Sequence, residues 1–416
     1  MKKTVLVRGP ALSQSGYGEH TRFVLRALRT REDELDIHIL PTKWGETGWL
    51  ATPSEDRTWI DQRVNKAAIH LQQKLPYDIS VQVTIPNEWQ DMAAVNIGVT
   101  AGIETNKVSP LWLHRANFMK KVITISEHSK NGFKTEYRGT NPNGGEAVEL
   151  GCDVPVEVTH YPVKTFDELP ELELNLEHDF NYLAVAQWGP RKNIQNLIRW
   201  FVEENHDEEV GLVVKMSLKN NSVVDREFAL EQVERSIPDI PDRKCKVYLL
   251  HGDMSESEMH ALYRHPKVKA MVSLTHGEGF GLPLFEAAYS GLPIVAPGWS
   301  GQCDFLYMPF ESKTKKNSGK RKAMFAEVDY TLGPVPKHAL WKDVIENDML
   351  WCYPTEGSFK LRMRQVRKNY SKWSTKAEKL QAWVCEEFRA DKMVKKLADS
   401  ILVKEESVSK IKVFSL

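Results

Sequence analysis

Short runs of β-branched residues alternate with helix-length amphipathic segments along most of this chain, and this alternation constrains the fold more than any other feature. Strands that alternate with helices form parallel sheets, and the helices cover the faces of those sheets. The strands expected in the first half are 4–9, 35–40, 78–84, 96–102, 121–126 and 156–163. Helices are expected between them, for example at 18–30 and 59–75. The first half is therefore predicted to be a doubly wound α/β domain.

The second half repeats this alternation after an acidic, proline-interrupted stretch, which we interpret as a linker at 166–180. The strands expected there are 181–187, 210–216, 245–252, 268–275 and 292–297. A length of 416 residues also suits two domains better than one. We therefore expect a first domain at 1–165 and a second at 181–373. One long helix is predicted at 374–402, with Ser374 as its N-cap.

Composition excludes several classes of protein. Lys and Arg number 56, as do Asp and Glu, so the formal net charge is zero and gives no global attraction to nucleic acid or anionic membranes. Five scattered cysteines without a C-x-x-C pair are typical of reduced thiols. The N-terminus has too short an apolar run for a signal peptide, and no run reaches the ~18 apolar residues of a transmembrane segment. We expect a soluble, cytoplasmic protein.

A glycine-containing loop follows the first expected strand, with Gly16 and Gly18 just before a helix. Glycines let the backbone approach an anion, and the start of a helix offers unpaired N–H groups. The dinucleotide fingerprint would need a third glycine where the chain has Thr21, and an acid after the second strand, whereas Asp36 stands at its start. Nicotinamide binding is therefore disfavoured, and a plain structural turn is the open alternative.

Two cations, Arg191 and Lys192, stand at the turn between the first strand and first helix of the second half. Cations at such a turn suit a diphosphate group. Taken alone, an Arg-Lys pair at the start of a helix is more often part of a solvated surface, and this alternative stays open.

Glu278 and Glu286 lie eight positions apart in the stretch THGEGFGLPLFEAAYSGLPIVAP, residues 275–297. The helix dipole tolerates an acid early in a helix, which accounts for Glu286 but not for Glu278 on the preceding loop. This stretch resembles the E-x7-E signature of the group-one, or family-four, retaining glycosyltransferases of GT-B architecture. The match runs nearly residue for residue from Glu278 to Val295, and the order of the other motifs is also similar.

The resemblance implies a fold and a set of roles. The fold would be GT-B, with two facing Rossmann-like doubly wound domains and a C-terminal helix and tail, 374–416, that cross back to the first. Glu278 would bind hydroxyls of the donor sugar and Glu286 the nucleotide ribose. Lys192 and Arg191 would neutralise the diphosphate leaving group. The backbone that wraps the sugar and phosphates would belong to Gly279, Phe280, Gly281 and Leu282, with Gly16 and Gly18 completing the cradle.

Two positions depart from the family's pattern. Gln187 stands where an arginine usually contacts the phosphates, so Arg191 is expected to compensate. Many members carry a histidine in the first domain, and Glu104 is our candidate for that side, with a helix-cap role as the open alternative. No D-x-D motif occurs, so we expect no cofactor and no metal, with basic side chains and helix N-termini in their place. The resemblance implies retention of configuration without a side-chain nucleophile.

The predicted activity is transfer of a hexose-type sugar from a nucleotide-diphosphate sugar to a glycan, glycolipid or lipid-linked acceptor. The stretch 313–322 carries six cations in ten residues, which motivates an alternative acceptor, hydroxymethylated pyrimidines in DNA. The neutral net charge argues against DNA. A third hypothesis is a non-catalytic nucleotide-sugar-binding subunit, motivated by Gln187 and the absent histidine. Tests of donor binding, donor turnover and salt-sensitive DNA binding separate the three.

Overall fold

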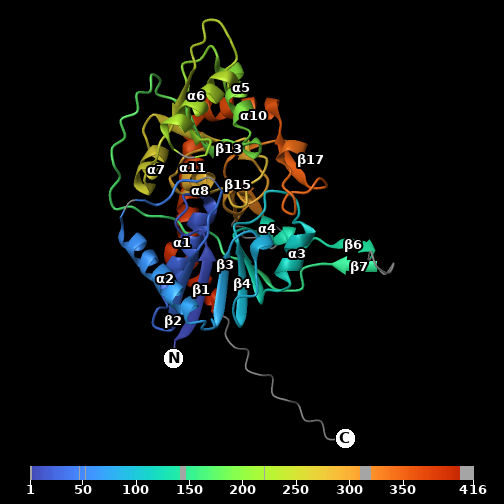
Figure 1. Cartoon of the computed structure of the whole chain (residues 1–416). Helices are drawn as coiled ribbons and strands as arrows, with labels where there is room; N and C mark the ends of the chain where they lie inside the picture. Colours follow the sequence, from blue (N-terminus) through green and yellow to red (C-terminus); the bar gives the residue numbers. More distant parts are fainter. Residues whose placement is uncertain are drawn as a thin grey trace, which may run out of the picture.

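Two six-stranded parallel sheets, each with helices packed against it, form two lobes that face each other (Figure 1). The computed structural model describes residues 2–45, 47–51, 53–140, 147–219, 221–309 and 320–402. The first lobe contains the first sheet, which lies between residues 3 and 158, and the second lobe contains the second sheet, between residues 181 and 328. The predicted fold class is therefore confirmed.

The first sheet has the strand order β2-β1-β3-β4-β5-β8. Its strands are β1 (Lys3–Gly9), β2 (Leu35–Pro41), β3 (Ile79–Val83), β4 (Val95–Thr100), β5 (Lys121–Thr124) and β8 (Val156–Val158). The helices of this lobe are α1 (Gly16–Arg29), α2 (Glu55–Gln72), η1 (Pro86–Glu88), α3 (Pro110–Ala116) and α4 (Glu127–Gly132), and a hairpin joins β6 (Tyr137–Thr140) to β7 (Ala147–Leu150). The strands are nearly continuous apolar runs because helices bury them, as is usual in parallel sheets.

The second sheet has the order β11-β10-β9-β12-β13-β16. Its strands are β9 (Asn181–Gln187), β10 (Gly211–Ser217), β11 (Lys246–Leu250), β12 (Val268–Val272), β13 (Ile294–Pro297) and β16 (Ala326–Val328). The helices are η2 (Pro190–Lys192), α5 (Ile194–Asn205), α6 (Val223–Ser236), α7 (Glu256–Tyr263), α8 (Leu282–Tyr289), α9 (Cys303–Leu306), η4 (Lys337–Ala339) and α10 (Glu356–Lys368). Two antiparallel hairpins follow α9, namely β14 (Tyr307–Pro309) with β15 (Arg321–Ala323), and β17 (Tyr330–Pro334) with β18 (Leu350–Pro354).

The single helix predicted at 374–402 is wrong. The structure has two helices there, α11 (Tyr370–Glu387) and α12 (Ala390–Ile401), and Ser374 lies inside α11, whose N-cap is Asn369. The break occurs at Phe388, whose ring is buried against Phe285 at 5.4 Å between centroids. The Phe388 carbonyl accepts a hydrogen bond from Val163 N at 2.8 Å, so tertiary contacts replace the next turn of helix.

The last helix crosses back to the first lobe, as the predicted fold class requires (Figure 1). α12 packs against α1, and its Leu397 and Ile401 side chains are buried. Ser400 Oγ donates a hydrogen bond to Glu157 at the edge of the first sheet. Residues 403–416, the predicted tail, lie outside the described residues.

The basic stretch is described only in part. Residues 313–319 lie outside the described residues, whereas Arg321–Ala323 form β15 by pairing with β14. Residues 321–323 therefore form a strand, because an antiparallel partner satisfies their backbone. Among the described residues, no helix is both long and apolar enough to cross a membrane.

Candidate active site

The E-x7-E stretch forms a tight loop after β12 and then the helix α8. Gly281 is the N-cap of α8 and has a φ of 93°, a left-handed conformation that glycine adopts without strain. Leu282 is the first helical residue, so Glu286 lies within the helix and Glu278 on the loop before it. The sequence pattern thus places the two acids on different elements.

Glu278 is buried and bound by two cations. Its side chain has one oxygen 2.5 Å from Lys192 Nζ and the other 3.0 Å from Arg191 Nη1. Thr275 Oγ1 also donates to it at 2.8 Å. Burial alone would raise the pKa of this carboxyl, but Lys192 and Arg191 outweigh burial and lower it to about 2. Glu278 is therefore ionised at neutral pH.

The basic turn η2 joins the two lobes through Arg191. Its guanidinium donates to Gly277 O at 2.6 Å and lies 3.5 Å from a carboxylate oxygen of Glu104, which belongs to the first lobe. The structure thus brings together four predicted residues, namely Arg191, Lys192, Glu278 and Glu104. The helix-cap alternative for Glu104 is wrong, because Ser109 caps α3.

Glycines allow the E-x7-E loop to touch the first lobe directly. A Cβ atom on Gly277 would lie 2.0 Å from the carbonyl oxygen of Glu104, and one on Gly279 would lie 2.2 Å from that of Ala101. Such distances exclude any side chain at either position. Phe280 between them turns its ring into the interior, 5.0 Å from Phe285 between centroids. Only the backbone of Phe280 is therefore left for the predicted contact with a sugar or phosphate.

Glu286 lines a pocket separate from the Glu278 site. The pocket is lined by Lys164, Met254, Glu256, Met259, His260, Tyr263, Glu286 and Tyr289. Tyr263 Oη donates to Glu286 at 2.9 Å. Burial raises the pKa of Glu286 to about 7, although Lys164 opposes this change. The pocket combines a carboxylate that titrates near neutral pH with aromatic and thioether walls, a lining suited to a nucleoside.

Lys164, which the sequence analysis did not single out, connects this pocket to the first lobe. Its Nζ lies 2.7 Å from a carboxylate oxygen of Glu256 on α7 and 3.1 Å from one of Glu19 on α1. Glu19 is buried, and burial alone would raise its pKa, but Lys164, Arg26 and Arg22 together hold the pKa well below its usual range. No sequence spacing links these groups, since Glu19 and Lys164 are far apart in the chain.

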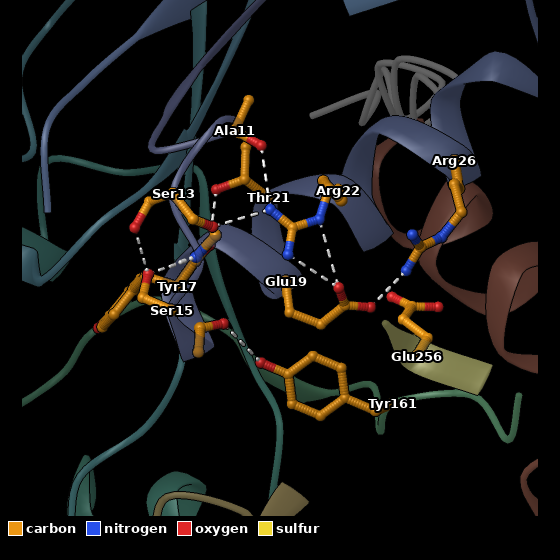
Figure 2. Close-up of polar contacts among 12 residues, drawn as sticks. Ala11, Ser13, Ser15, Tyr17, Glu19, Thr21, Arg22, Arg26, Tyr161 and Glu256 are labelled. Carbon is orange, nitrogen blue, oxygen red and sulfur yellow. Dashed lines mark hydrogen bonds and ion pairs between the residues drawn. The ribbon is translucent and has the colours of Figure 1, made fainter. Parts of the chain in front are cut away.

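Gly16 and Gly18 do not precede the first helix as predicted but lie in the first turn of α1, whose N-cap is Ser15. The loop before this turn is held by Arg22. Figure 2 shows the Arg22 guanidinium between Glu19 and two loop carbonyls, which accept hydrogen bonds at 3.1 Å (Ala11) and 2.9 Å (Ser13). A Cβ on Gly18 would lie 1.9 Å from Ser13 O, so packing requires glycine there. A Cβ on Gly16 would meet no atom within 4 Å, so this position faces open space. The anion-binding role of both glycines stays a prediction.

The described residues contain no group of three or more His, Cys, Asp or Glu side chains that could hold a metal ion. Gln187, which stands in place of the family's arginine, donates instead to Leu218 O at 2.9 Å.

Comparison with known sequences gives one partial match. No protein-family model matches the chain. The probable sucrose-phosphate synthase 5 of Oryza sativa subsp. japonica is 26% identical over 132 residues, which cover 30% of this chain and 13% of that protein. The match thus spans only a small part of the length of this curated relative.

Comparison with solved structures gives matches over nearly the whole chain. HepE from Anabaena, solved with UDP and glucose, has a TM-score of 0.57 and 14% identity and covers 96% of this chain and 99% of its own. The sucrose-phosphate synthase of Thermosynechococcus elongatus has a TM-score of 0.62 and 12% identity, with 96% and 98% covered. A glycosyltransferase from Rickettsia africae has a TM-score of 0.58 and 13% identity, with 96% and 99% covered. The chain therefore has the GT-B fold of these glycosyltransferases.

Proposed function

We propose that this chain is a glycosyltransferase that uses a nucleotide-diphosphate sugar as its donor. The observation that carries the proposal is the contact of Glu278 with Arg191 and Lys192, next to Glu104 of the opposite lobe. The GT-B fold supports this class of reaction, and HepE, which shares the fold, was solved with UDP and glucose.

The donor would bridge the two acids. Its diphosphate would bind Arg191 and Lys192, because charge-assisted hydrogen bonds to phosphate are strong and guanidinium groups match phosphate geometry. The ribose would bind Glu286 in the neighbouring pocket. In the structure both cations form ion pairs with Glu278. A bound diphosphate would pair with these cations instead, so that the Glu278 carboxylate could accept hydrogen bonds from the sugar.

The chemical step breaks the bond between the anomeric carbon and the phosphate oxygen while the acceptor hydroxyl oxygen bonds to the same carbon and gives its proton to an oxygen of the departing diphosphate. The diphosphate leaves with the electron pair of the broken bond, and Lys192 and Arg191 stabilise its growing charge. As part of the proposal, this neutralisation needs no metal, and the sugar keeps its anomeric configuration. Glu104 is the predicted first-lobe carboxylate beside this centre, 3.5 Å from the Arg191 guanidinium.

The acceptor class, a glycan or a lipid-linked precursor, rests on the family resemblance. The DNA alternative gains no support from the structure, since most of the basic stretch at 313–322 lies outside the described residues. Only a measurement of donor turnover distinguishes an enzyme from a non-catalytic subunit that binds the donor.

A panel of UDP-, GDP- and ADP-sugars tests the proposal, first by thermal shift and then by release of the free nucleotide. A donor that binds the native state raises its melting temperature by mass action. We expect one class of donor to stabilise the wild type, and Lys192→Met to abolish that shift, whereas Lys379→Met, an exposed lysine on α11, keeps it. Failure of every sugar to bind contradicts the proposal, and binding without nucleotide release favours the non-catalytic subunit.

A further inference from the structure

Two tryptophans are far more exposed than the others. Trp49 is 51% exposed and Trp341 is 49% exposed, whereas the other ten tryptophans of the described chain are buried or only partly exposed. A large apolar side chain held in solvent is informative when it lies beside a functional site. Both tryptophans lie on loops attached to the same edge of the first sheet.

Trp49 is fixed to the glycine loop. It follows β2, and it forms an isolated antiparallel bridge with Ser13 in the loop that follows β1. The neighbouring backbone adds two hydrogen bonds, from Gln14 N to Gly48 O and from Leu50 N to Leu12 O, each 2.9 Å long. Trp49 is therefore held beside the loop that we expect to approach the donor phosphates.

Trp341 belongs to the second lobe but lies on the first. It sits in the connection between β17 and β18, where Trp341 and Ile345 exchange two backbone hydrogen bonds of 3.0 and 2.7 Å. In the same turn, the carbonyl of Asp343 accepts hydrogen bonds from Ser109 Oγ at 2.7 Å and Asn87 Nδ2 at 3.1 Å. Asn87 and Ser109 stand after β3 and β4, so the turn is fastened to the carboxyl edge of the first sheet.

The base of the same hairpin is fastened to the candidate active site. Leu350 N donates to Asn106 Oδ1 at 2.8 Å, two residues from Glu104. Cys352 N donates to His276 O at 2.9 Å, two residues before Glu278, and the His276 ring stacks on Trp351. The β17–β18 hairpin thus connects residues next to Glu104 and Glu278 with the turn that carries Trp341.

Ligands of doubly wound sheets bind at the carboxyl ends of the strands, where loops of neighbouring strands converge. Trp49 and Trp341 are attached to loops after β1, β3 and β4, which are consecutive in the sheet. With the donor bound mainly by the second lobe, this edge is the side from which an acceptor can reach the anomeric carbon. An indole ring offers a large rigid face with an N–H donor at its rim, and little entropy is lost when it is covered.

We propose that Trp49 and Trp341 form an acceptor-binding platform that stacks on the sugar rings of a carbohydrate acceptor. The inference rests on the proposed function and deepens it, because it assigns the acceptor class and gives the second lobe, through the β17–β18 hairpin, a share in acceptor recognition. The occupant is a glycan because the apolar faces of sugar rings match indole faces while their hydroxyls stay in water.

The test measures sugar transfer to a panel of oligosaccharides and aryl glycosides, and, in parallel, donor hydrolysis by water. We expect Trp341→Ala and Trp49→Ala each to raise the acceptor KM about tenfold, with donor KM and hydrolysis unchanged. Trp341→Phe and Trp49→Phe should recover most of the affinity, since an aromatic face remains. Phe118→Ala is the matched control, because Phe118 is a 61% exposed aromatic residue just before β5, at the opposite edge of the sheet.

The outcomes separate the two proposals. A wild-type protein that neither binds nor hydrolyses any donor overturns the proposed function, and the platform with it. Donor hydrolysis without transfer to any carbohydrate of the panel overturns the platform alone. The same holds if the alanine variants keep the wild-type acceptor KM, or if they lose donor hydrolysis in parallel with transfer.

Discussion

Glu278 and Glu286 lie in one motif, and both are substantially withdrawn from solvent, yet the structure gives them opposite ionisation behaviour. The pKa of Glu278 falls to about 2 because two cations contact its carboxylate and outweigh burial. The pKa of Glu286 rises to about 7 because burial prevails and the nearby Lys164 opposes it only in part. Spacing in the sequence therefore sets where the two acids lie, whereas residues distant in the chain set their charge.

The largest effect is expected on stability when Glu278 loses its charge. Glu278→Gln leaves Arg191 and Lys192 without their shared carboxylate in a buried site, so the free energy of unfolding should fall by about 3–5 kcal/mol. Denaturant titration measures this loss. Glu286→Gln is the matched control, since no cation depends on that carboxylate in the same way. Equal losses of unfolding free energy in both variants would contradict the difference between the two acids.

Lys192→Met should lower turnover by about 10²–10³-fold, because a cation aimed at the leaving diphosphate stabilises charge that develops in the transition state. Steady-state rates of nucleotide release measure the effect, with Lys379→Met as the control. Turnover within a factor of about three of the wild type would show that the diphosphate leaves elsewhere.

The two acids should also differ in how they couple stability to pH. The pKa of Glu286 is raised from 4.5 to about 7 in the folded protein, so its ionisation lowers stability as pH rises through that window, by up to about 3 kcal/mol. Glu278 has the opposite sign, since its stabilisation is present above pH 4.5 and is lost as pH falls toward 2. The test measures melting temperatures of the wild type and Glu286→Gln between pH 5 and 8 in steps of about half a unit. The melting temperature of Glu286→Gln should fall less with rising pH than that of the wild type. An unchanged pH profile would contradict the assignment.

The smallest effect is expected at Lys164. Lys164→Met removes the cation that opposes the raised pKa of Glu286, so the pH midpoint of donor binding should move upward and affinity at pH 7 should fall severalfold. Calorimetric titration over a pH series measures the shift. Lys164→Arg keeps the charge and should stay close to the wild type, whereas a similar change in both variants would point to lost packing.

The sequence predicted the elements that depend on local patterns. Strand β9 lies where the apolar run at 181–187 predicts it, and the glycines of the E-x7-E stretch predict the bend before α8. The approach of Arg191 and Lys192 to Glu278 was expected only through the family resemblance, because the residues lie more than 80 positions apart.

Features that depend on tertiary contacts were not predicted from the sequence. The chain at 374–402 has an unbroken helical pattern, and only the burial of Phe388 against Phe285 of α8 and its hydrogen bond from Val163 divide it. Lys164 lies just before the predicted linker at 166–180, and its partners Glu19 and Glu256 come from different lobes. The β17–β18 hairpin was missed because its strands are short and pair with each other instead of extending the second sheet.

A crystal structure of the chain with a nucleoside diphosphate tests the central claim most directly. The account predicts phosphate oxygens within hydrogen-bonding distance of Arg191 and Lys192, ribose hydroxyls on Glu286, and a Glu278 carboxylate released from at least one of its two cations. A nucleotide bound outside the space between the lobes, with Glu278 still paired to both cations, would contradict it.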